Sequence, residues 1–407
     1  MRTSTASTPT TARASAGRRA SATPSCSPGR AVADASTIVH VVVDRAGGQS
    51  TSPVGRYGVA LAQALAATAP RGVEVAPFAS AADAEQRERV AALLPGLEVA
   101  FAKVPPRELR EAWLHSFTTA RFDGILHATS LLAPLRSREG TPVQSVVTVH
   151  RLPAATAPAG RRERWERRAL RRAVRLADGI VVPTHAHAAA LEELHDVGDR
   201  VRVVAGGPPR WATPPADAEA RRAHLGLPGE YLVAWTSPGA LADAQRLVDV
   251  VASGAMPNVP VVVLGPVAFG DTTIAELAVA AGLRPARLRM LGDVADADAA
   301  AVVQGATSAI QLDPDPGFAA EVLGALALGT PVVHPASEAL QEIAAEATLA
   351  VQLAGDASDA DRLAHGLAQV LEHEPMRERL ALLGQDRARA FDWSTTATQL
   401  WHLHAEL

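Results

Sequence analysis

The sequence predicts an α/β protein made of two lobes, each with a parallel sheet covered by helices on both faces. Its 407 residues are too many for one ordinary core and fit two domains of roughly 150–200 residues each. Short apolar strands alternate with helical segments along the chain, which is typical of doubly wound sheets. The first strand precedes a glycine pair and a helix, which is how a Rossmann-like lobe begins.

In the first lobe, the apolar run at residues 38–43 predicts the first strand, and Gly47 and Gly48 lie in the loop after it. A helix follows from about residue 55 to 67. Such a loop and helix N-terminus aim N–H groups at the carboxyl edge of the sheet, where an anion or polar ligand is stabilised. Further strands are predicted at residues 73–75, 124–126, 145–149, 179–182 and 201–204.

The second lobe begins after proline-rich breaks at residues 207–209 and 214–215, which mark the linker. Its predicted strands lie at residues 231–235, 261–264, 288–291, 308–312 and 331–333. The predicted domains are a disordered tail rich in Ala, Ser, Thr and Arg at 1–36, an N-terminal lobe at 37–210, a C-terminal lobe at 211–388 and a terminal helix at 389–407.

Composition excludes several classes of protein. With 48% hydrophobic and 20% charged residues and a net charge of −4, we expect a globular protein that does not bind nucleic acid. The single cysteine, Cys26, excludes an internal disulfide framework and fits a reducing cytoplasm. No stretch approaches the ~18–20 consecutive apolar residues of a membrane-spanning helix, and the tail lacks the apolar core of a secretory signal. We therefore expect a cytoplasmic location.

Residues 317–333 are the most informative segment: they read Gly-Phe-Ala-Ala-Glu-Val-Leu-Gly-Ala-Leu-Ala-Leu-Gly-Thr-Pro-Val-Val. This resembles the nucleotide-sugar segment of retaining GT-B glycosyltransferases of the large family-four group, Glu-Gly-Phe-Gly-Leu-Pro-x-x-Glu-Ala-x-Ala-x-Gly-x-Pro-Val. Aligned on that pattern, its two glutamates fall at Pro316 and Gly324. The resemblance covers roughly residues 38–405. It implies the GT-B fold, with an interdomain cleft and a terminal helix that crosses back to the first lobe.

The resemblance also implies site residues in the first lobe. Gly55-Arg56-Tyr57 is similar to a step after the glycine loop in some members, and His127 and His150 match histidines that follow strands. A polar residue at the carboxyl end of a parallel strand faces the cleft. This favours a catalytic role for His127 and substrate binding by His150, Arg56, Gly47 and Gly48. Alternatively, each imidazole bonds a neighbouring carbonyl and Arg56 is solvated.

The second lobe departs from the pattern where a donor diphosphate would bind. The family's arginine and lysine fall at about Leu241 and Ala242, so Arg246, one turn later, is predicted as the replacement. Glu321 lies one helical turn before Gly324, and its carboxylate is predicted to act on a sugar hydroxyl or ribose as a catalytic residue. The alternative for Glu321 is that it complements the helix dipole. The other predicted substrate contacts are Asp313, Asp315, Gly317 and Phe318.

Residues 161–176 form a predicted amphipathic helix with eight arginines. Such a helix either lies on the inner surface of the membrane or packs its apolar stripe on the sheet with solvated arginines, and we favour packing. No metal site is predicted, because His185 and His187 point to different helix faces.

The predicted function is therefore transfer of a sugar from a nucleotide-sugar co-substrate to a glycan or lipid-linked hydroxyl, without a metal cofactor. Such a reaction would serve cell-envelope polysaccharide synthesis in a bacterium. A second hypothesis is a catalytically degenerate paralogue that binds or regulates a partner glycosyltransferase, because the donor-site cations and both motif glutamates are replaced. A third, a sugar-nucleotide epimerase, is weaker because Phe391-Asp392-Trp393 fits the transferases better.

Overall fold

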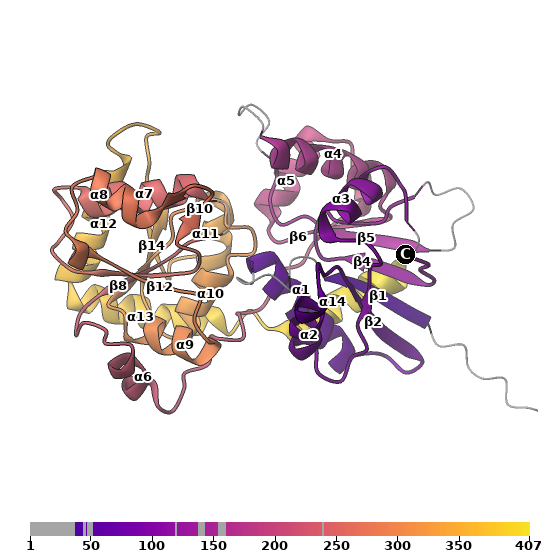
Figure 1. The fold of residues 1–407 in the computed structure, drawn as a ribbon, viewed down its shortest axis with the longest axis horizontal. Helices are drawn as coiled ribbons and strands as arrows, with labels where there is room; N and C mark the ends of the chain where they lie inside the picture. Colours follow the sequence, from indigo (N-terminus) through magenta and orange to yellow (C-terminus); the bar gives the residue numbers. More distant parts are fainter. Residues whose placement is uncertain are drawn as a thin grey trace, which may run out of the picture. The chain divides into compact units, whose positions relative to one another are not determined.

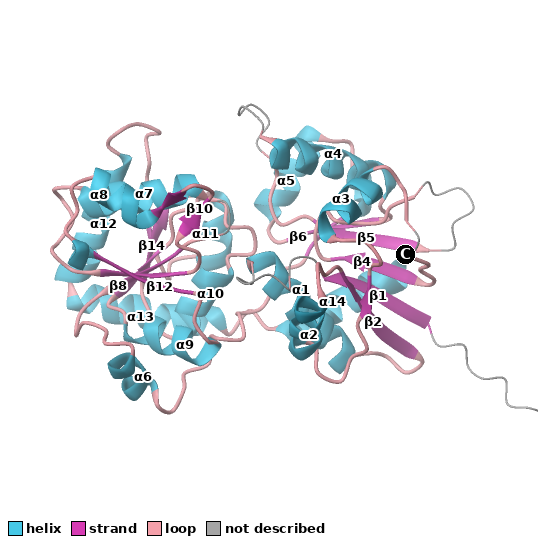
Figure 2. Cartoon of the chain, viewed as in Figure 1, coloured by secondary structure: helices cyan, strands magenta, loops and turns pink. Residues whose placement is uncertain are grey.

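The computed structural model describes residues 37–43, 46, 52–118, 120–136, 143–153, 160–237 and 240–407. Residues 36–407 form one compact unit. The unit contains two parallel sheets flanked by helices (Figures 1 and 2), so the predicted fold class is confirmed. The predicted tail, residues 1–36, and the predicted contacts Gly47 and Gly48 lie outside the described residues.

The first sheet has seven parallel strands among the described residues, in the order β3-β2-β1-β4-β5-β6-β7. They are β1 Thr37–Val43, β2 Val73–Ala79, β3 Ala100–Phe101, β4 Ile125–Ala128, β5 Gln144–Thr148, β6 Gly179–Val182 and β7 Val201–Val203. The helices of this part are α1 Pro53–Ala67, α2 Ala84–Leu93, α3 Pro106–Leu114, α4 Arg161–Leu176 and α5 His185–Leu194. The strand order reverses between β1 and β4, which makes their carboxyl ends a topological switch point.

The second sheet has six parallel strands among the described residues, in the order β12-β9-β8-β13-β14-β15. They are β8 Leu232–Trp235, β9 Val261–Leu264, β12 Leu288–Gly292, β13 Ser308–Ile310, β14 Val332–Pro335 and β15 Leu349–Val351, and a small hairpin joins β10 Ala268–Phe269 to β11 Thr272–Thr273. The helices are α6 Ala218–His224, α7 Leu241–Ala252, α8 Ile274–Ala280, α9 Asp296–Gly305, α10 Ala320–Ala327, α11 Glu338–Ala344, α12 Asp359–Glu372 and α13 Glu374–Ala388. Here the switch point lies between β8 and β13.

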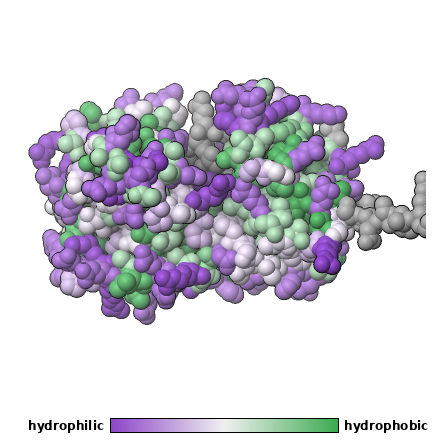
Figure 3. All heavy atoms as spheres, turned by 90° about the horizontal axis from the view of Figure 1, so that it is seen from below, coloured by the Kyte–Doolittle hydropathy of each residue, from purple (hydrophilic) through white to green (hydrophobic). Residues whose placement is uncertain are grey.

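Both faces of each sheet are buried, and the alternation along the strands shows why. Val233 packs with α9, α10 and α11, whereas its neighbours Leu232 and Ala234 pack with α7 and α12 on the opposite face. Successive side chains of a strand point to opposite faces, so a strand covered on both faces needs a continuous apolar run. The surface drawn in Figure 3 mixes hydrophilic residues with smaller apolar areas.

The last helix, α14 Trp393–Glu406, packs on the first sheet's side. Its buried Leu400 and Leu403 belong to the same core cluster as Leu61 and Leu65 of α1. Asp392 caps the helix by accepting hydrogen bonds from the N–H groups of Ser394 and Thr395. The indole N–H of Trp393 donates to the Pro208 carbonyl at 2.8 Å.

One predicted strand ends later in the structure than expected, whereas the favoured packing of residues 161–176 on the sheet is confirmed. Strand β2 continues to Ala79, four residues past the predicted end. Proline has no N–H to donate to a neighbouring strand, but β3 pairs only with Phe78 and Ala79, so Pro77 interrupts no hydrogen bond to β3. Helix α4 buries Trp165, Ala169, Leu170 and Ala173 in the core beside the sheet, so its apolar stripe is packed within the protein. Among the described residues, no helix is both long and apolar enough to cross a membrane.

Candidate functional site

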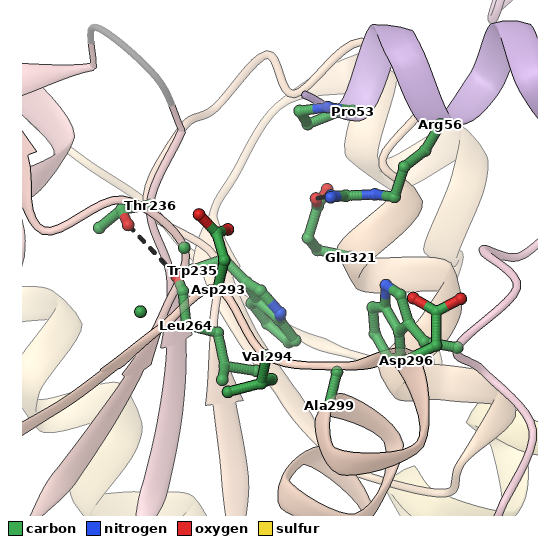
Figure 4. A pocket seen from close by; sticks show the side chains of 13 residues that line it. Pro53, Arg56, Trp235, Thr236, Leu264, Asp293, Val294, Asp296, Ala299 and Glu321 are labelled. Atoms are coloured by element: carbon green, nitrogen blue, oxygen red, sulfur yellow. Dashed lines mark hydrogen bonds and ion pairs between the residues drawn. The ribbon is translucent and has the colours of Figure 1, made fainter. Parts of the chain in front are cut away.

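A pocket lies at the carboxyl ends of β8, β9 and β12 and is covered by the start of α1 (Figure 4). Its empty space is about 540 Å³ with its open mouth included. The lining residues are Pro53, Arg56, Trp211, Trp235, Thr236, Leu264, Gly265, Gly292, Asp293, Val294, Asp296, Ala299 and Glu321. Ligands of open parallel sheets bind at this edge.

Two indoles form an aromatic part of the pocket wall. The rings of Trp211 and Trp235 are stacked, with centroids 6.2 Å apart and planes inclined by 27°. Trp235 is the last residue of β8, so its position at the sheet edge follows from the strand. Flat aromatic faces of this kind bind planar apolar groups such as nucleobases by stacking.

Trp211 occupies the space in which the family's second glutamate would stand. A Cβ atom built on Gly324 would lie 2.3 Å from Cη2 of Trp211, much closer than two carbon atoms pack. The absence of a side chain at Gly324 is therefore what allows the indole to pack against α10. A carboxylate at this position and the indole at Trp211 exclude each other.

Glu321 lies one turn earlier on α10 and enters the pocket. Its Oε1 is 2.5 Å from Nη2 of Arg56 on α1, in an ion pair whose side chains are 10% and 31% exposed. Figure 4 shows the two side chains facing each other at the pocket. The structure therefore brings two predicted site residues together, and Arg56 is not simply solvated. The carboxylate of Glu321 can accept hydrogen bonds from hydroxyls of a sugar or ribose.

The turn before α10 contains a residue in an unfavourable backbone conformation. Ala319 has φ 51° and ψ 46°, the left-handed region, where the family pattern has glycine. The left-handed conformation costs an L-residue ~1–2 kcal/mol, and glycine's greater freedom in the unfolded chain offsets part of the gain. We predict that Ala319→Gly raises the free energy of unfolding by about 0.5–1 kcal/mol, measured by denaturant unfolding. Ala320→Gly, next to it within the helix, is the control and is expected to lower stability; equal effects would contradict the strain at Ala319.

Asp313 and Asp315 form a separate polar cluster after β13. Asp313 Oδ2 is 3.3 Å from Nη1 of Arg151, and Asp315 Oδ1 is 2.8 Å from Nε2 of His187. Burial raises the pKa of Asp313. Burial also opposes ionisation of Asp315, but hydrogen bonding to His187 leaves its pKa lowered. The cluster joins α5 to the loop before α10, and neither aspartate lines the pocket.

Arg246, the predicted phosphate contact, is engaged by its own surroundings. Its Nη1 donates to the Leu312 carbonyl at 2.7 Å and lies 3.4 Å from Oδ1 of Asp243. Burial, together with the charge of Asp313, raises the pKa of Asp243 to about 6. Arg246 is not among the residues that line the pocket, because its guanidinium turns back onto the end of β13.

Gly317, Phe318 and His150 meet where the loop before α10 touches the first lobe. Nε2 of His150 bonds the Thr129 carbonyl at 2.8 Å, and the rings of His150 and Phe318 lie 5.5 Å apart. Gly317 has φ 69°, and a Cβ atom there would lie 3.0 Å from the His150 carbonyl oxygen. These residues form a contact between the lobes beside the pocket without lining it.

His127 is fully buried and does not reach the pocket. Its Nδ1 is 3.1 Å from Nε2 of His404 on α14, and its Nε2 is 3.0 Å from the Thr148 hydroxyl. Burial first, and then the charges of His404 and His150, lower the pKa of His127 well below its usual value. We expected His127 to face the cleft, but α14 covers this strand end. A catalytic role for His127 stays a prediction that would require both partners to release the ring.

Several pocket residues were not predicted from the sequence. The position of Trp235 at the end of a predicted strand could have indicated it as a pocket residue, since ligands bind at that edge of a parallel sheet. Asp293 and Asp296 follow β12 in the same way. Nothing in the sequence connects Trp211 with Gly324. Among the described residues there is no group of three or more metal-ligating side chains placed to hold an ion.

Residues 54–207 match the family described as Glycosyltransferase Family 4. Phosphatidyl-myo-inositol mannosyltransferase of Mycobacterium tuberculosis is 31% identical over 153 residues, which are 36% of this chain and 39% of that protein. The protein of the same name from Mycobacterium leprae is 30% identical over 120 residues, 29% of this chain and 31% of that protein. The matches thus span about two fifths or less of the length of these curated relatives.

Solved structures match this chain over most of its length. Sucrose-phosphate synthase from Thermosynechococcus elongatus superposes with a TM-score of 0.69 at 19% identity, over 91% of this chain and 98% of that one. Anabaena HepE in complex with UDP-glucose superposes with a TM-score of 0.67 at 16% identity, over 91% and 100%. At these identities the likeness establishes the fold. Residues 54–207 therefore resemble Glycosyltransferase Family 4, and the described part of the chain has the GT-B fold.

Proposed function

We propose that this protein is a retaining glycosyltransferase that moves a hexose from a nucleotide sugar to a hydroxyl of a glycan or lipid-linked acceptor. The observation that carries the proposal is the pocket at the carboxyl edge of the second sheet, where the Trp211 and Trp235 indoles and the Glu321 carboxylate meet. An aromatic face suits a base, and a carboxylate suits ribose or sugar hydroxyls. The mannosyltransferase relatives and the UDP-glucose complex of HepE support it.

In the proposed reaction, the bond between the sugar's anomeric carbon and the diphosphate oxygen breaks, that carbon bonds to the acceptor oxygen, and the acceptor's proton passes to the departing diphosphate. Negative charge grows on the departing diphosphate, so groups that stabilise it accelerate transfer. Because this fold stabilises the diphosphate with protein cations and helix N-termini, no metal ion is expected to be required. The second hypothesis, a regulator without turnover, differs by predicting no transfer.

The acceptor side of the proposal rests on the first lobe. A lipid-linked acceptor would bring the protein to the inner face of the plasma membrane, within the cytoplasm. Helix α4 offers a positive face for anionic headgroups; its exposed arginines are Arg161, Arg162, Arg164, Arg168, Arg171 and Arg175. Because its apolar stripe is buried, this contact would be electrostatic and weakened by salt.

The test is release of nucleoside diphosphate from UDP-, GDP-, ADP- and dTDP-hexoses by the full chain, with and without bacterial membrane extract as a source of acceptor. The proposal expects release from one donor, accelerated by the extract. Binding of a donor without release under either condition would favour the regulator hypothesis over an enzyme.

We predict that Glu321→Gln weakens binding of the preferred nucleotide sugar by about 10–100-fold, since a hydrogen bond to a charged acceptor contributes ~1.5–3 kcal/mol. Isothermal titration calorimetry measures the effect. Glu338→Gln is the matched control, because Glu338 is also an acid in the first turn of a helix, α11, but is exposed and away from the pocket. Unchanged binding in Glu321→Gln would exclude Glu321 from the donor site.

A further inference from the structure

The start of α7 is unsuited to binding a diphosphate. The two cations of the family pattern that the sequence resembles fall at about Leu241 and Ala242. The charged group in the first turn of this helix is instead Asp243, a carboxylate that would repel phosphate. Arg246 is bonded to the Leu312 carbonyl and lies beside Asp243. A diphosphate bound near the pocket therefore needs its positive charge from another element.

Arg56 supplies such a charge from α1 of the first lobe. Among the described residues that line the pocket, Arg56 is the one with a positive charge, and the acids Asp293, Asp296 and Glu321 line it too. Its Nη2 lies 2.5 Å from Glu321 Oε1, and its side chain is 31% exposed. A guanidinium has five N–H donors in a planar fork, a geometry that suits phosphate oxygens as well as carboxylates.

Glu321 also holds the guanidinium of Arg56 beside the first turn of α10. It is the second residue of that helix, and the capping residue Ala319 makes no side-chain hydrogen bond. The first-turn N–H groups of a helix carry partial positive charge. The guanidinium of Arg56 is thus held beside the first turn of α10 on the pocket wall.

We infer that Arg56 binds the diphosphate of the donor in place of the cations missing from the second lobe. The inference rests on the proposed function and adds the residue that recognises the phosphates. Without nucleotide, Glu321 holds the guanidinium at the pocket. When the nucleotide binds, its ribose hydroxyls donate hydrogen bonds to the Glu321 carboxylate, and its diphosphate accepts hydrogen bonds from the Arg56 guanidinium. Arg56 therefore contributes in proportion to the number of phosphates on the ligand, whereas Glu321 contributes to the nucleoside.

The experiment compares ligands that differ only in phosphate number. Calorimetry measures binding of uridine, UMP and UDP, and of guanosine, GMP and GDP, to the full chain and its variants. Arg56→Gln is expected to weaken diphosphate binding roughly tenfold or more while nucleoside binding changes by less than about twofold. Arg56→Lys, which keeps the charge without the planar fork, is expected to fall between. Glu321→Gln is expected to weaken nucleoside binding while preserving the diphosphate-to-nucleoside affinity ratio.

Two controls make the result specific. Arg202→Gln removes another arginine paired with a glutamate, Arg202 with Glu406 at 3.2 Å, remote from the pocket, and is expected to bind like the wild type. Arg246→Gln tests the rival cation. Wild-type diphosphate affinity in Arg56→Gln, or a selective diphosphate loss in Arg246→Gln alone, overturns the inference but leaves the proposed function standing. Failure of the unaltered chain to bind any diphosphate or nucleotide sugar overturns both.

Discussion

Replacing Gly324 with alanine is expected to lower the free energy of unfolding by about 1–2 kcal/mol, although alanine is the better helix former. The new Cβ would lie 2.3 Å from Cη2 of Trp211, and overpacking of this kind costs ~1–3 kcal/mol. The gain in helix propensity is at most ~1 kcal/mol and offsets only part of it. Denaturant unfolding monitored by circular dichroism measures the change.

A double-mutant cycle identifies the cause. Trp211→Leu removes the indole, so Gly324→Ala should cost little or become stabilising in that background, with a coupling energy of at least ~0.5 kcal/mol. Nucleotide binding should fall in both variants that disturb the indole. An unchanged cost of Gly324→Ala without the indole would show that Trp211 is not what restricts this position.

Acidification from pH 8 to pH 5 is expected to remove roughly 2 kcal/mol of stability through His404 alone. Burial lowers the pKa of His404 from 6.5 to about 4. Between these values the unfolded chain binds a proton that the folded protein excludes, so stability is complete above about pH 6.5 and is lost as pH falls toward 4. His127, whose pKa burial also lowers, adds a loss of the same sign. Denaturant unfolding at several pH values measures it.

The matched control for His404 lies on the same helix. His404→Gln is expected to reduce the slope of the unfolding free energy against pH by the equivalent of up to one bound proton. His402→Gln should leave that slope unchanged, since His402 is exposed. The folded protein should also lose the docking of α14 first, because His404 contacts His127 beneath that helix. Equal slopes in wild type and His404→Gln would mean that this histidine pair does not control acid stability.

The sheets were predictable because their signal is local. Apolar runs such as residues 261–264 form strands buried on both faces, and the predicted ends of most strands agree with the structure within one or two residues. The segment from Gly317 to Val333 indicated the resemblance because its glycine and proline spacing is typical of a turn followed by a helix and then a strand.

The site was less predictable because its contacts join distant residues. Arg56 and Glu321 are 265 positions apart, and His127 and His404 are 277 apart. Helical spacing correctly suggested that Glu321 shares a face with Gly324, but nothing local indicated that Trp211 fills the space beside that glycine. Likewise, the position of His127 at a strand end indicated the cleft, whereas the terminal helix covers it. Arg246 is the cation that follows the expected phosphate contacts in sequence, whereas Arg56 is the one that lines the pocket among the described residues.

The central claim, that the pocket beside Trp235 and Glu321 binds a nucleotide sugar, is tested most directly by titrating the full chain with UDP-, GDP-, ADP- and dTDP-hexoses in a calorimeter. The account predicts binding of one donor with a dissociation constant of roughly 1 µM to 1 mM, the usual range for enzyme substrates, weakened by Glu321→Gln. Absence of heat with every donor, from a protein that melts cooperatively, would contradict it.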